Sequence, residues 1–282
     1  MWILFALTSA TILASRKIQE KKLVSSIWWV MWWMIRVGSV ISALLIWWIF
    51  SRSIEGIMSP NLWWVLLYCF FTYPLLIVFY YKAMEHLPLS LFGMLAPIVP
   101  VASLLGTWVI YDTIPSMGGF IWLWAISIGI IALFWRHENK EISILSLIFA
   151  VFSYMIMWFG SVLDKIAIWE VSSSLYTLLN QMTALTSLFL FSFLYFRWPH
   201  IHFYKKNFKM LSFIGVTQGI GYLWGMMAIS LSPNPWYVVA LVNTHAIITA
   251  LYWVFVLKEK ITRKKVFVFL CMLIALISFA FA

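Results

Sequence analysis

The sequence predicts an all-α polytopic membrane protein with ten transmembrane helices, arranged as two inverted five-helix repeats. Three observations lead there: an extreme composition, an alternation of charge between loops, and a repeat of landmarks in the two halves. Of 282 residues, 64% are hydrophobic and 10% are charged, and the mean hydropathy is +0.97. Soluble domains carry about 25% charged residues. The apolar runs take up nearly the whole chain, so we expect no separate soluble domain.

The apolar runs have the length that a bilayer requires, about 20 residues for each crossing helix. Trp28 and Trp47 each begin a tryptophan pair in the second run, 19 residues apart. This spacing corresponds to about 28 Å of helix, close to the thickness of the hydrocarbon core. The first run is short, but Arg16 and Lys17 can extend from it to the interface. The ten predicted spans are residues 2–14, 26–50, 63–84, 89–110, 118–135, 143–163, 172–196, 208–231, 235–257 and 264–282.

Positive charge alternates between successive loops. Of the 19 Lys and Arg residues, 16 lie in the loops that follow the odd-numbered spans. The opposite side holds only Arg52 and Lys165, and Arg36 lies within the second span. Loops rich in Lys and Arg stay in the cytoplasm, so the pattern predicts that both termini lie outside. The net charge of +10 is thus explained by orientation and by contact with anionic lipid, and it indicates no nucleic-acid partner.

Landmarks repeat when the chain is shifted by 147 residues. Asp112 then aligns with Glu259, and Pro88 aligns with Pro235. Each half also has a proline-bearing corner between its third and fourth spans and an acidic residue at the end of its fourth. Because five is odd, two five-span halves insert in opposite orientations, as in many secondary transporters. The predicted repeats are residues 1–138 and 143–282.

Several short motifs occur in an order that is typical of one carrier family. They are Tyr81-Lys82-Ala83 and Pro88-Leu89-Ser90 at the corner between spans 3 and 4, Pro97 in span 4, the turn Asp112 to Gly119, Leu163-Asp164-Lys165 at the end of span 6, and Lys258-Glu259-Lys260 at the end of span 9. With Arg36 in span 2, the chain resembles the EamA-type ten-helix carriers of the drug/metabolite transporter superfamily over essentially its full length. The resemblance implies a transporter. The chain departs from the family in its orientation: family members usually have both termini in the cytoplasm, whereas the loop charges here predict that both lie outside.

Polar side chains near the middle of spans are the candidates for a binding site. A charge as deep as Arg36 costs about 2.5–3.5 kcal/mol on insertion scales, so it needs a partner or water. It is either a cation that lines a cavity and binds an anionic group, or a structural arginine bonded to helix carbonyls or snorkelling. Mid-span amides either bond neighbouring helices or line a polar cavity. The predicted substrate-binding residues are Arg36, Tyr73, Gln181, Gln218, Tyr222, Asn243 and His245.

The acidic residues all fall near predicted span ends, Asp164 among them. We therefore expect no coupling carboxylate inside the membrane. His245 could relay protons, but a lone histidine within a span more often only donates a hydrogen bond. Pro97 and Pro100 predict a bend in span 4 beside the site. Four glycines between residues 215 and 225 predict either close helix packing or a hinge. We find no catalytic set, metal site or cofactor motif, so we expect no enzyme.

The function that these features favour is secondary transport of a small polar or amphipathic metabolite by alternating access, as an exporter or exchanger. Within transport, nucleotide-sugar or lipid-linked sugar translocation is an alternative. From another class, the alternative is a membrane scaffold or assembly subunit that transports nothing. A carrier predicts a central cavity lined by both halves, and a scaffold predicts a dry, packed centre. The expected partners are a small molecule and the lipid of a plasma or inner membrane; a homodimer is left open.

Overall fold

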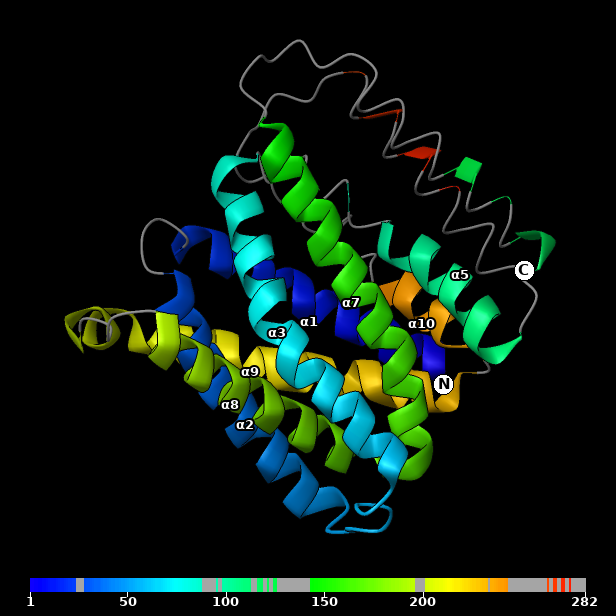
Figure 1. Cartoon of the computed structure of the whole chain (residues 1–282), viewed down its shortest axis with the longest axis horizontal. Coiled ribbons are helices and arrows are strands. Elements are labelled where there is room, and N and C mark those ends of the chain that lie inside the picture. The colour runs from blue at the N-terminus through cyan, green and yellow to red at the C-terminus, as the bar shows by residue number, and fades with distance from the viewer. Residues whose placement is uncertain are drawn as a thin grey trace.

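The computed structural model describes residues 1–23, 28–87, 98–112, 143–195, 201–232 and 234–242, with short pieces between 95 and 125 and between 263 and 274. In this part of the chain every regular element is a helix, which confirms the all-α prediction. The helices are α1 (Trp2–Leu23), α2 (Trp28–Phe50), α3 (Pro60–His86), α5 (Ile98–Tyr111), α7 (Ile144–Glu170), α8 (Ser173–Tyr195), α9 (Ile201–Leu231) and α10 (Pro235–Val242) (Figure 1).

Among the described residues, three helices are long and apolar enough to cross a membrane: Pro60–Ala83, Ile144–Glu170 and Phe208–Leu231. Large apolar side chains are exposed on the outside of the helix bundle, for example Trp48, Trp64 and Phe71. A helix surface of this kind is suited to lipid. The expected count of ten spans is not reached among the described residues, because the fifth and tenth predicted spans and most of the ninth lie outside them.

Several helices extend beyond the predicted spans. α1 continues to Leu23, well past the end expected at residue 14, and α9 begins at Ile201 instead of residue 208. α7 runs to Glu170, although the span was expected to end at residue 163. The reason is physical: hydropathy marks the apolar stretch, whereas Lys, Glu and Gln are good helix formers and continue the helix beyond it.

α9 passes close to two helices through two pairs of glycines. A Cβ atom on Gly215 would lie 2.8 Å from the Ile35 carbonyl oxygen of α2, and one on Gly219 would lie 2.9 Å from the Ser39 carbonyl oxygen. Gly221 faces α1, where Ser9 Oγ donates to the Gly221 carbonyl oxygen over 2.7 Å. The glycines thus let the backbones approach closely, the first of the two roles expected for them.

The helices enclose a centre that is not filled everywhere. α3 packs along α7, while α9 lies against α1 and α2, and α10 lies against α1 and α5 (Figure 1). One buried cluster gathers around Tyr81 and Tyr154, and a second around Tyr176 and Leu62. Members of both clusters border the same internal cavity.

Candidate substrate-binding cavity

A cavity of about 240 Å³ lies between seven helices: α1, α2, α3, α5, α7, α9 and α10. Most of its wall is apolar or aromatic. Gly160, Gly221 and Gly225 lie along it, so that two helix backbones face the space with little side-chain cover. Polar groups in the wall come from Arg36 (α2), Tyr73 (α3), Asp164 (α7), and Gln218 and Tyr222 (α9).

The predicted binding residues fall into three groups. Arg36, Tyr73, Gln218 and Tyr222 all line this cavity, and they come from α2 and α3 of the first half and from α9 of the second. Gln181 does not line it but contacts Arg36 from α8. Asn243 and His245 lie outside the described residues, as does Pro97, so their roles and the bend of span 4 stay predictions.

Arg36 is held in the cavity wall by groups from two other helices. Its side chain is only 3% exposed. Nη1 donates to Gln181 Oε1 over 2.5 Å, and the guanidinium carbon lies 4.9 Å from the centre of the Tyr73 ring. An amide oxygen and an aromatic face stabilise the cation without neutralising it. Gln181 Nε2 is buried behind the cavity wall and has no acceptor among the described residues.

A chain of hydrogen bonds leads from Tyr73 to Asp164 behind the cavity wall. The Tyr73 hydroxyl donates to Asn180 Oδ1 over 2.5 Å, and Asn180 Nδ2 donates to the Tyr176 hydroxyl over 3.0 Å. The Tyr176 hydroxyl in turn donates to Asp164 Oδ1. The Tyr222 hydroxyl lies 3.3 Å from each Asp164 carboxylate oxygen. Each bond of this chain donates in the direction of Asp164, which is the final acceptor, and Asn180 Nδ2 also lies 3.7 Å from Cys69 Sγ.

The position of Asp164 corrects the sequence analysis. We expected it at the end of a span, but it is 6% exposed, lies in the cavity wall and is followed by six more residues of α7. The neighbouring Lys165 is 4% exposed and donates to the carbonyl oxygens of Ile229 and Ser232, over 2.6 and 2.9 Å. The apolar residues after Lys165 were the missed signal, because they show that the helix continues beyond the charged pair.

One end of the bundle is closed by polar contacts between the two halves of the sequence. Ser51 Oγ, just after α2, lies 3.3 Å from Ser172 Oγ, just before α8. Asn61 Nδ2 at the start of α3 donates to Glu170 Oε1 at the end of α7 over 2.8 Å. Gly56 has φ +77°, and a Cβ atom there would lie 1.8 Å from the Glu170 carbonyl oxygen. The loop between α2 and α3 therefore sits tightly on the end of α7.

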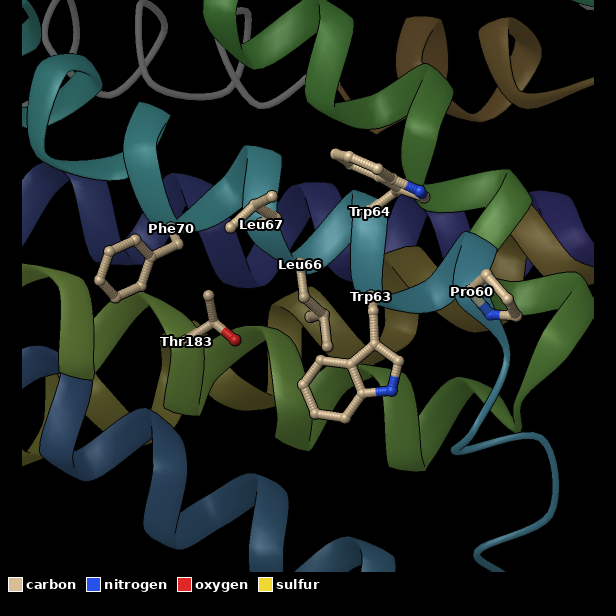
Figure 2. A pocket seen from close by; sticks show the side chains of 7 residues that line it. All are labelled: Pro60, Trp63, Trp64, Leu66, Leu67, Phe70 and Thr183. Atoms are coloured by element: carbon tan, nitrogen blue, oxygen red, sulfur yellow. The ribbon is translucent and has the colours of Figure 1, made fainter.

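A second hollow lies on the outer surface between α3 and α8, with a volume of about 480 Å³. Figure 2 shows its lining side chains, most of them tryptophan, leucine and phenylalanine, with Thr183 of α8 as the only hydroxyl. Trp63 and Trp64 are 52% and 70% exposed. An exposed apolar groove of this kind fits the side of a membrane helix that contacts lipid, and it has too few polar groups to orient a polar metabolite.

Comparison with known proteins supports the fold and goes no further. No family model matches the sequence, and no curated protein matches it either. A solved structure, described as "Crystal structure of protein", superposes with a TM-score of 0.76 over 99% of this chain and 97% of that chain. The two sequences are 12% identical, so the similarity shows a shared helical architecture.

Proposed function

We propose that the chain is a secondary transporter of a small polar or amphipathic metabolite, an exporter or exchanger that works by alternating access in a plasma or inner membrane. The observation that carries the proposal is the internal cavity, which is bordered by α1, α2, α3 and α5 of the first half and by α7, α9 and α10 of the second. A scaffold would instead have a packed centre. A carrier needs a site between its two halves, which can close alternately on either side of it.

The size and the chemistry of the cavity indicate the kind of substrate. Pockets for drug-sized ligands span about 300–1,000 Å³, so a cavity of about 240 Å³ suits a smaller molecule. Its largely apolar wall favours an amphipathic molecule. Arg36 in the cavity wall provides a place for a carboxylate, a phosphate or another acceptor group. A nucleotide sugar is larger than this space.

The packing of the helices supports an inverted repeat of residues 1–138 and 143–282. If the first half is exchanged for the second, α1 takes the place of α7, α2 of α8, α3 of α9, and α5 of α10. The packing of α5 on α7 then corresponds to that of α10 on α1, and both occur. The contact of α3 with α7 likewise corresponds to that of α9 with α1, which also occurs.

This correspondence follows from the predicted spans, since α8 belongs to the seventh span and α9 to the eighth. Under it, α2 on α9 corresponds to α8 on α3, and α2 on α8 corresponds to itself; these pairs are also in contact. We therefore include in the proposal the ten-helix plan and membership of the EamA-type carriers. The proposal also places both termini outside, as the loop charges indicate.

The proposal is tested by flux and by ligand binding. The full-length protein, reconstituted in proteoliposomes, should move at least one member of a library of small amphipathic metabolites. The same compound should raise the thermal unfolding midpoint of the purified protein, because a ligand that binds the folded state stabilises it. A library that yields neither flux nor thermal stabilisation would favour the scaffold.

A further inference from the structure

Asp164 is a buried carboxylate for which the described residues supply no positive partner. Its hydrogen bonds come from the hydroxyls of Tyr176 and Tyr222. Lys165 is adjacent in sequence, but its ammonium group is bound to two carbonyl oxygens of the α9 end. Arg36 is held by Gln181 and the Tyr73 ring. Burial of a carboxylate is costly unless it is paired with a cation or neutralised by a proton.

The surroundings of Asp164 leave room for such a partner. An ionised carboxylate offers about four acceptor sites, and the two tyrosines do not fill them. Asp164 borders the cavity, and so do Gly221 and Gly225 of α9, which carry no side chain to obstruct access. Because the chain from Tyr73 through Asn180 to Tyr176 donates toward the carboxylate, it favours negative charge there.

From this geometry we propose that Asp164 is a cation-binding site of the cavity. It takes a single positive charge from the cavity, either an ammonium group of the transported molecule or a coupling ion, namely a proton or Na⁺. The inference rests on the proposed transport function and deepens it. The cavity then has two charged binding positions: Arg36 binds acceptor groups, and Asp164 binds a cation.

The other ionisable groups around the cavity do not offer the same chemistry. Those that face it are Arg36 from α2, Tyr68, Cys69, Tyr73 and Tyr80 from α3, and Tyr222 from α9. Tyr176 of α8 and Tyr111 of α5 lie behind the wall; the latter donates to the Val162 carbonyl oxygen. The described lining residues of α1 and α10 do not ionise. None of these groups is a carboxyl; among the described residues that line the cavity, Asp164 is the one with a carboxyl group, which ordinarily takes up a proton below neutral pH.

Infrared difference spectroscopy of the full-length protein in lipid tests the proposal, because it observes carboxyl and carboxylate bands directly. Three additions are compared: a step from mildly alkaline to mildly acidic buffer, Na⁺ in place of N-methylglucamine, and 2-phenylethylammonium. In the wild type, at least one addition should produce a carboxyl or carboxylate band that is lost in Asp164→Asn. The arm that responds identifies the source of the charge.

Two further variants keep the test decisive. Asp164→Glu should retain a shifted band, which shows that the loss in Asp164→Asn comes from the carboxyl group and not from misfolding. Asp112→Asn, at an exposed position with φ 54° that asparagine tolerates, should keep the wild-type spectrum. Identical spectra of the wild type and Asp164→Asn in all three arms would overturn the inference, whatever the flux assays give. If no flux is found but the Asp164 band responds, the transport function is contradicted and the cation site at Asp164 is retained.

Discussion

The guanidinium of Arg36 on α2 donates to the side-chain oxygen of Gln181 on α8 over 2.5 Å. The two residues are 145 positions apart and belong to different halves of the sequence. The bond joins α2 to α8, and the guanidinium carbon lies 4.9 Å from the centre of the Tyr73 ring of α3. A charged group held in this way is fixed in direction, which is what recognition of an acceptor group requires.

The first prediction follows from the Arg36 contact. In Arg36→Ala or Gln218→Leu, the protein should reach the membrane folded, but transport should be strongly reduced. Loss of a hydrogen bond to a charged group costs about 1.5–3 kcal/mol, or roughly a tenfold to hundredfold loss of affinity. Flux in proteoliposomes measures the effect, and Thr183→Val in the outer groove serves as control. Native rates in the two cavity variants would show that the cavity residues do not bind the substrate.

The sequence carried enough information for the helix class and for part of the cavity. Arg36, Tyr73, Gln218 and Tyr222 were singled out because polar groups in apolar spans stand out, and the structure brings them to one cavity. The partner of Arg36 depends on the rotation of α2 and α8 about their axes, which hydropathy does not specify. Asp164 was misplaced because a charged pair was taken as the end of a span, although α7 continues through it.

The second prediction concerns the glycines of α9. Gly215→Ala should destabilise the protein, because the new methyl group would meet backbone atoms of α2 at 2.8 and 2.9 Å, and backbone cannot move aside cheaply. Overpacking of this kind typically costs about 1–3 kcal/mol. Gly160→Ala on α7 is the matched control: its nearest neighbour would be a Tyr68 ring atom at 3.9 Å. Thermal unfolding monitored by size-exclusion chromatography should separate the two; equal midpoints would contradict the close α2–α9 contact.

The third prediction is the orientation. Of the 19 positive residues, 16 fall on the side predicted to be cytoplasmic, so we expect both termini outside. In a bacterial host, a C-terminal alkaline phosphatase fusion should be active, and a C-terminal green fluorescent protein fusion should stay dark. The reverse pair of results would place the termini in the cytoplasm, as is usual for the EamA-type carriers that the chain resembles.

The fourth prediction tests movement at the closed end of the bundle. Ser51 Oγ and Ser172 Oγ lie 3.3 Å apart, one beside the end of α2 and the other beside the start of α8. The double variant Ser51→Cys with Ser172→Cys should form a disulfide on oxidation, since side-chain atoms this close fall within reach of the bond. Because α2 and α8 belong to different halves, alternating access requires this end to separate. The oxidised protein should therefore lose transport, and a reducing agent should restore it.

The single variants Ser51→Cys and Ser172→Cys provide the controls for this lock, since neither can form the bond alone. The native thiols interfere little, because Cys69 is buried within α3 and Cys271 is half-buried. Disulfide formation is measured by mass spectrometry of the oxidised protein, and flux is measured in the same sample. Full transport in a sample that is completely crosslinked would mean that α2 and α8 stay together at this end throughout the cycle. The two halves would then not separate at this end, which would contradict rocking of the halves about the cavity.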